Sequence, residues 1–230
     1  MNRNNISIKK KEADQLSATI EQIEDHNIKV RRNPSSCKPG SCQCCGVASD
    51  EITRHDTRKR QFYVIAEQVI RTVIGLLIRW KCPCCGKTFT DYPDFALPYK
   101  RYTLPTILTF SAFYTEDDQI SYRRVNIKMP VVYPDSESQM SHTSIHRWIT
   151  DLGNSTEIIQ NSIDIILQAD PMSSICRDIA NLFVPSKKYR SIERLKLLSQ
   201  CRQFLKIQKL FNFKFGVKIF PNFRTFFSFQ

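Results

Sequence analysis

The apolar residues along the chain form patterns that predict its main elements. Residues 11–30 carry apolar side chains at helical intervals and predict a short helix, and the polar stretch 31–36, with Pro34, predicts a linker after it. The apolar positions of this helix are Ala13, Leu16, Ile20 and Ile23. The segment 58–80 is rich in Phe, Tyr, Val and Ile and predicts two or three strands, with Gly75 as a bend or bulge.

Helical patterns dominate after residue 103. Apolar spacing and end signals predict helices over 104–114, 141–152 and 155–168, the second of them followed by Gly153. We therefore expect an α+β protein in which a small β-rich domain precedes an α-helical region.

Two short cysteine motifs give the strongest chemical signal. Cys42-Gln43-Cys44-Cys45-Gly46 and Cys82-Pro83-Cys84-Cys85-Gly86 each contain C-x2-C followed by Gly, the pattern of a zinc knuckle. Four thiolates would close one tetrahedral site, and a closed site folds a domain rather than performing chemistry. The predicted ligands of one structural Zn²⁺ are Cys42, Cys45, Cys82 and Cys85. The 36 residues between the motifs exceed the commonest spacing and leave room for a strand-rich insert.

The other cysteines receive weaker interpretations. Cys44 and Cys84 lie inside the knuckles and are interpreted as non-ligands, although either could replace a neighbour. Cys37 is a weaker alternative ligand, five residues before the first motif. Cys176 and Cys201 are expected to be buried apolar thiols.

Charge favours a protein that binds nucleic acid, and the lack of long apolar runs argues against a membrane-spanning protein. The 230 residues include 34 Lys and Arg against 22 Asp and Glu, a net charge of +12 that favours a polyanionic partner such as nucleic acid. The best apolar run, Val73 to Ile78, is too short to cross a membrane, and the N-terminus lacks a secretory pattern. We therefore expect a cytoplasmic protein whose cysteines bind metal rather than form disulfides.

The stretch 42–102 resembles the zinc-ribbon domain of bacterial insertion-sequence proteins, which are transposases and their accessory proteins. The resemblance rests on Arg54-His55 after the first knuckle, the run Trp80 to Thr90 around the second, and the tail Pro93 to Tyr102. It implies binding of double-stranded DNA during transposition, with Arg54 and His55 as candidate contacts. The alternative is that His55 is structural or has no role.

A second candidate for DNA binding follows. On a helix over 141–152, one apolar stripe opposes a polar face, and Ser141 would cap the N-terminus, as in a recognition helix. The stripe is Ile145, Trp148, Ile149 and Leu152, and the candidate DNA contacts are Thr143, His146, Arg147 and Thr150. The stretch 120–125, with Arg123 and Arg124, resembles the preceding helix of a transposase helix-turn-helix. The connection between them is longer than usual and contains prolines, and an amphipathic core helix is the alternative.

Four segments follow from these interpretations. They are an N-terminal helix and linker over 1–41, a zinc ribbon over 42–102, a helix-turn-helix-like domain over 103–154, and a basic, Phe-rich region over 155–230. The last 27 residues contain nine Phe and five Lys or Arg, which suggests either a surface that stacks on single strands or a truncated or frameshifted transposase gene.

No complete catalytic constellation is present in the sequence. A transposase core of the RNase H type needs three carboxylates from a mixed sheet, and only 77 residues follow Gly153. The interpretation is therefore a DNA-binding protein of a mobile element without the catalytic part, and not an enzyme. The alternatives are a rubredoxin-like iron electron carrier and an interaction ribbon that recruits a separate transposase subunit. The sequence does not give the oligomeric state.

Overall fold

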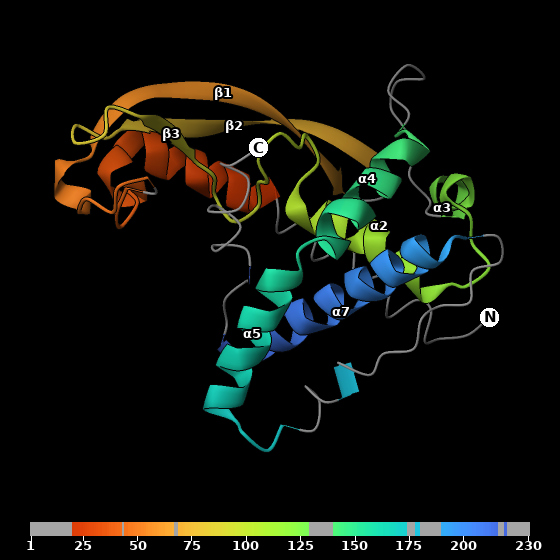
Figure 1. The fold of residues 1–230 in the computed structure, drawn as a ribbon. Helices are drawn as coiled ribbons and strands as arrows, with labels where there is room; N and C mark the ends of the chain where they lie inside the picture. Colours follow the sequence, from red (N-terminus) through yellow and green to blue (C-terminus); the bar gives the residue numbers. More distant parts are fainter. Residues whose placement is uncertain are drawn as a thin grey trace. The chain divides into compact units, whose positions relative to one another are not determined.

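The protein is an α+β chain that divides into two compact units, Met1–Thr106 and Ile107–Gln230. The computed structural model describes residues 20–42, 44–66, 69–128, 140–173, 178–179, 190–215 and 219. The first unit holds the sheet and both cysteine motifs, and the second holds most of the helices. The sheet and the helices are drawn in Figure 1. The four predicted segments are finer than this division and stay a prediction.

A three-stranded antiparallel sheet forms the centre of the first unit. Its strands are β1 (Thr53–Ala66), β2 (Val69–Lys81) and β3 (Thr88–Asp91), in the order β1-β2-β3. Two strands therefore occupy the segment predicted as two or three. The short β3 comes after the second knuckle and pairs only with the last residues of β2, from Ile78 to Lys81.

Gly75 is not a bulge, so this part of the prediction was wrong. The pairing of β1 with β2 runs through Gly75 without interruption, and the register shift lies between Arg54 and Asp56. A Cβ atom on residue 75 would lie 2.7 Å from Cε2 of the buried Phe62 side chain. The close approach of Phe62 therefore favours glycine at this position.

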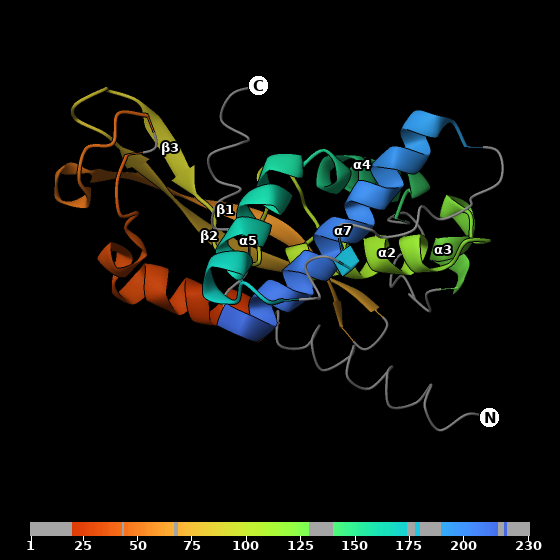
Figure 2. The same ribbon diagram turned by 60° about the horizontal axis from the view of Figure 1, so that its bottom comes forward.

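A helix over residues 20–32 covers the edge of β2 that β3 leaves open (Figure 2). The Asn27 side chain donates to the Ile74 carbonyl and accepts from the Leu76 amide, both at 2.8 Å. His26 Nε2 lies 2.8 Å from the Leu76 carbonyl oxygen. The helix thus satisfies strand groups that an open edge would leave unpaired.

The N-terminal part of the chain differs from the prediction in one respect. The described part of the predicted helix is helical, and residues 11–19 lie outside the described residues. The helix continues to residue 32, and a 3₁₀ turn follows over Pro34–Cys37, so most of the predicted linker has regular structure. Val30, the last residue of the predicted helix, is 2% exposed and packs in a core cluster.

Alternating side chains of β2 pack into two separate cores, because successive residues of a strand point to opposite faces of the sheet. One core surrounds the cysteine knuckles and consists of Val30, Cys42, Ile52, Leu76, Ile78, Trp80 and Cys82. The other consists of Ile23, Phe62, Val64, Leu77, Phe95 and Ala96. The chain after β3 belongs to the second core, where Phe95 packs edge-on against Phe62 at a ring separation of 5.4 Å.

The helices whose bounds the described residues give after the sheet are α2 (Leu104–Glu116), α3 (Tyr122–Lys128), α4 (His142–Gly153), α5 (Thr156–Ala169) and α7 (Ile192–Phe215). Helix α7 packs against both α4 and α5, and α3 packs against α4 (Figures 1 and 2). The four residues of the predicted apolar stripe of α4 are buried. Ser141 caps α4 as predicted, because its side chain accepts from the Thr143 amide.

The Phe-rich region begins inside α7. Phe204 and Phe211 are buried on this helix, whereas Phe213 is 86% exposed. The remainder of the region, apart from residue 219, lies outside the described residues. Across the part of the chain that is described, no helix is both long and apolar enough for a membrane span.

Candidate metal centre and nucleic-acid interface

The two knuckles fold with the same backbone hydrogen bonds. In the first, the Cys42 amide donates to the Val47 carbonyl at 2.8 Å, and the Gly46 amide donates to the Cys42 carbonyl at 2.9 Å. In the second, the corresponding bonds from Cys82 to Lys87 and from Gly86 to Cys82 are both 3.0 Å. Gly46 and Gly86 have φ angles of 72° and 69°, a left-handed conformation that favours glycine.

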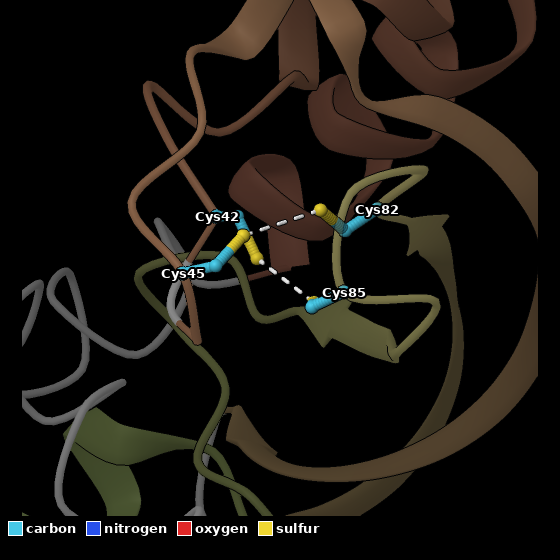
Figure 3. Close-up of side chains that lie close together, drawn as sticks. All are labelled: Cys42, Cys45, Cys82 and Cys85. Carbon is cyan, nitrogen blue, oxygen red and sulfur yellow. Dashed lines mark hydrogen bonds between the residues drawn. The ribbon is translucent and has the colours of Figure 1, made fainter.

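These turns bring four sulfur atoms into one cluster. The Sγ atoms of Cys42, Cys45, Cys82 and Cys85 all lie within 4.8 Å of one another. Cys42 Sγ is 3.8 Å from Cys85 Sγ, and Cys45 Sγ is 3.6 Å from Cys82 Sγ (Figure 3). Metal–sulfur bonds of about 2.3 Å in a tetrahedron place neighbouring sulfurs about 3.8 Å apart. The cluster therefore has the dimensions of a four-thiolate metal site and could hold a metal ion.

Strand β2 and its core position the cluster. Cys82 directly follows the last residue of β2, and the second knuckle connects β2 to β3. Cys42 and Cys82 are 3% and 0% exposed and pack in the same core as Trp80. Cys45 is exposed and Cys85 is half-buried. One side of the sulfur cluster therefore faces the core, and the other reaches the surface.

Three of the four thiols have shifted pKa values, in different directions. Burial of Cys42 raises the pKa of its thiol, but the amides of Cys45 and Cys44 outweigh this effect and lower the pKa to about 6. At Cys45 the Val47 amide favours the thiolate, but loss of solvent and the adjacent thiols raise the pKa to about 12. The pKa of Cys85 is also raised. A bound dication would favour the thiolate form of all four cysteines.

The remaining cysteines of the described residues lie outside the four-sulfur group. Cys44 and Cys84 are exposed, and Cys37 is half-buried against the core beneath the knuckles. Cys201 is buried in the second unit, and burial raises the pKa of its thiol to about 12. Cys176 lies outside the described residues.

The candidate DNA contacts of the first unit lie at the bulge of β1. Arg54 and His55 are both exposed, and the register shift between Arg54 and Asp56 leaves His55 without a paired residue on β2. The Arg54 guanidinium donates to the Thr57 hydroxyl at 2.7 and 3.1 Å. Both side chains are therefore accessible to a ligand next to the metal centre.

The candidate contacts of the second unit divide into two groups. Arg123 and Arg124 on α3, and Thr143, His146 and Arg147 on α4, are exposed. Thr150 is half-buried, because its hydroxyl accepts a hydrogen bond of 2.8 Å from Arg194 of α7. Sequence reasoning missed Arg194 because it lies 44 residues away from Thr150 in the chain. Only the general excess of basic residues after residue 154 pointed to this region.

Comparison with known proteins gives one match. A protein-family model described as "Domain of unknown function (DUF6431)" matches residues 42–127. This segment is similar to that family. The match starts at the first cysteine of the cluster and includes both knuckles, the three strands, α2 and most of α3. It covers less than half of the chain, and its description names no activity. No curated protein and no solved structure matches the chain.

Proposed function

We propose that this chain is a DNA-binding protein of a mobile element, related to transposases but without their catalytic core, and that one structural Zn²⁺ folds its first unit. The observation that carries the proposal is the four-sulfur cluster, which two turns with matching hydrogen bonds hold at tetrahedral spacing. The resemblance of residues 42–102 to insertion-sequence zinc ribbons supplies the biological setting.

The chemistry of the donor set favours zinc with a structural role. Four thiolates in a tetrahedron are typical of Zn²⁺ or of iron, and they leave no open position for a substrate. An ion at this place would connect the chain before β1 to the turn between β2 and β3. Because an unfolded chain has no preformed site, the free energy of metal binding would add to the stability of the first unit.

Charge and exposure support DNA as the partner. The net charge of +12 favours a polyanion, and Arg54, Arg123, Arg124 and Arg147 are all exposed. Helices α3 and α4 pack together, and α4 buries its apolar stripe while Thr143 and Arg147 remain accessible. This arrangement is compatible with a helix-turn-helix in which α4 contacts base edges.

A mobility assay with zinc-loaded protein and duplex DNA at two salt concentrations tests the proposal. We expect a shift at low salt that weakens strongly at higher salt, because each phosphate contact releases counterions. Treatment with a chelator under reducing conditions should weaken the shift and abolish the β-sheet circular dichroism. Absence of any shift at low salt with fully zinc-loaded protein would contradict the DNA-binding part of the proposal.

One observation favours a second candidate function, that of an iron electron carrier. Cys45 is exposed, so one side of the cluster is accessible to a redox partner, as electron transfer requires. The two candidates differ in colour, because a ferric tetrathiolate is red and a zinc site is colourless. Purified protein that is red and contains one iron per chain would support the electron carrier.

A further inference from the structure

Two arginines of the second unit converge on the side of α4. Arg194 lies in the first turn of α7, and Arg190 lies just before this helix. Nη1 of Arg194 donates to the Thr150 hydroxyl at 2.8 Å, and Nη2 donates to the His146 carbonyl at 3.4 Å. Arg194 Nη2 also donates to the Tyr122 hydroxyl. The Arg194 guanidinium group is therefore anchored next to α4.

Two stacked tyrosines lie against this arginine pair. Tyr114 and Tyr122 stack with their ring centroids 4.0 Å apart and their planes inclined by 7°. The Cζ atoms of Arg190 and Arg194 lie 5.3 and 5.7 Å from the centroid of Tyr122, within the range of cation–π attraction. Nη2 of Arg190 donates to the Tyr114 hydroxyl at 3.4 Å. The aromatic pair thus fixes the direction of both planar groups.

The partners of this arginine pair in the described part of the chain are neutral. They are the hydroxyls of Tyr114, Tyr122 and Thr150 and the carbonyl of His146. Burial and the neighbouring Tyr122 raise the pKa of Tyr114, so this phenol does not supply a negative charge. Nε of Arg194 is buried and makes no hydrogen bond to the described residues. Arg190 is exposed and Arg194 is half-buried, and the neutral partners leave both positive charges free to attract an anion.

His146 shows the same excess of positive charge. Partial burial lowers the pKa of His146, and the charges of Arg194, Arg190 and Arg147 lower it further. His146 packs edge-on against Tyr122 at a ring separation of 5.4 Å. Both arginines also lie against Tyr122, so their charges act on the His146 ring. The field at this point of the surface is therefore positive.

We propose that Arg190 and Arg194 form a binding site for a phosphate group, which in the DNA-bound protein is a phosphate of the duplex backbone. Arg190 is exposed, and its planar guanidinium group can bind phosphate oxygens through two parallel hydrogen bonds. Arg194 donates to three groups of the protein and would contribute its charge and one remaining Nη1 hydrogen. This inference rests on the proposed DNA-binding function and adds two residues to it. In this arrangement the side of α4 near Thr150 contacts the phosphate backbone of the DNA, and Arg147 contacts base edges.

The salt dependence of DNA affinity tests this site in the zinc-loaded full chain. Arg190→Gln and Arg194→Gln should each weaken binding to specific and random duplexes alike. Each should also reduce the slope of log K against log salt by about 0.9, the value of one phosphate contact. Lys196→Gln is the matched control, because it removes one charge from an exposed position two residues after Arg194 on the same helix. The control should keep the slope of the original chain.

Thermal melting of the variants tells loss of folding apart from loss of DNA binding. Arg194→Lys keeps the charge but loses the planar fork, and thermal melting shows whether any variant fails to fold. Arg190 is exposed, so Arg190→Gln should fold even if Arg194→Gln does not. A slope for folded Arg190→Gln equal to that of Lys196→Gln would overturn the site while leaving the DNA-binding proposal intact.

If the original chain binds no duplex, the proposed function fails first, and calorimetric titration with inorganic phosphate decides about the site. Phosphate binding that Arg190→Gln loses and Lys196→Gln keeps would support the site with a free phosphate compound as its ligand. No phosphate binding by the original chain would overturn it.

Discussion

Gly75 has no space for a side chain, because the Phe62 ring lies directly over its backbone. A Gly75→Ala substitution places Cβ less than 3 Å from two atoms of a ring that is 0% exposed and cannot move outward. We expect the free energy of unfolding to fall by about 1 to 3 kcal/mol, as for other overpacked cores. Urea unfolding followed by circular dichroism measures this change.

Gly40→Ala provides the control for this substitution. A Cβ atom at Gly40 meets nothing within 4 Å, so its replacement should change stability little. Equal effects of the two substitutions would show that Phe62 does not press on Gly75 as described.

His26 makes the stability of the first unit depend on pH. Burial lowers the pKa of His26 below its usual 6.5, and acceptance of its hydrogen bond by Leu76 offsets this only in part. Because the folded pKa lies below the unfolded one, the neutral ring stabilises the fold above about pH 6.5, and this contribution is lost as pH falls through the folded value. Stability should therefore decrease on acidification.

The comparison of His26→Gln with the original chain isolates this contribution. Glutamine can still donate to the Leu76 carbonyl but does not titrate. Protonation of the cysteines affects both proteins, so the difference between their unfolding free energies at about pH 7.5 and about pH 5 reports the histidine alone. Parallel pH profiles would refute this role of His26.

The helix over residues 20–32 protects β2 mainly through one side chain. Asn27→Ala removes the partners of the Ile74 carbonyl and the Leu76 amide, and we expect a loss of about 1 to 3 kcal/mol in unfolding free energy. Hydrogen exchange of the Leu76 amide should accelerate in the variant. Asn33→Ala is the control, since Asn33 is exposed and its side chain forms no cap. Unchanged exchange at Leu76 would argue against edge protection by this helix.

Local patterns predicted most of these elements, and long-range contacts account for those that were missed. Richness in Phe, Tyr, Val and Ile indicated the β1–β2 segment, and the single stripe and Ser141 cap indicated α4. Helix α7 was not predicted, because it packs against both α4 and α5 and its buried residues do not form one stripe. The bulge predicted at Gly75 was wrong for a related reason. The contact that excludes a side chain there comes from Phe62, which lies on the neighbouring strand and far away in the sequence.

The metal centre and the arginine pair differ in how far the sequence reveals them. Repeated C-x2-C-G motifs carry the ligand types, their spacing and the glycine turn within a few residues, so the four cysteines could be predicted before the structure. The hydrogen bonds of Arg194 to Thr150 and Tyr122 join residues separated by 44 and 72 positions. Such pairs follow from the packing of helices and leave no local pattern.

The two units have distinct tasks in the proposed function. The first depends on metal for its fold, and the second supplies α4 and the arginine pair. Removing the metal should therefore unfold the first unit while the helical circular dichroism of the second persists. Loss of all structure on chelation would contradict this independence.

Elemental analysis of the purified chain together with two matched serine variants tests the metal centre most directly. Cys82→Ser removes a ligand of the sulfur cluster, whereas Cys84→Ser changes an exposed thiol two residues away in the same knuckle. We predict one zinc ion per chain in the original protein and in Cys84→Ser, and loss of tightly bound zinc in Cys82→Ser. Zinc retained equally by both variants, or no bound metal in the original protein, would contradict the account.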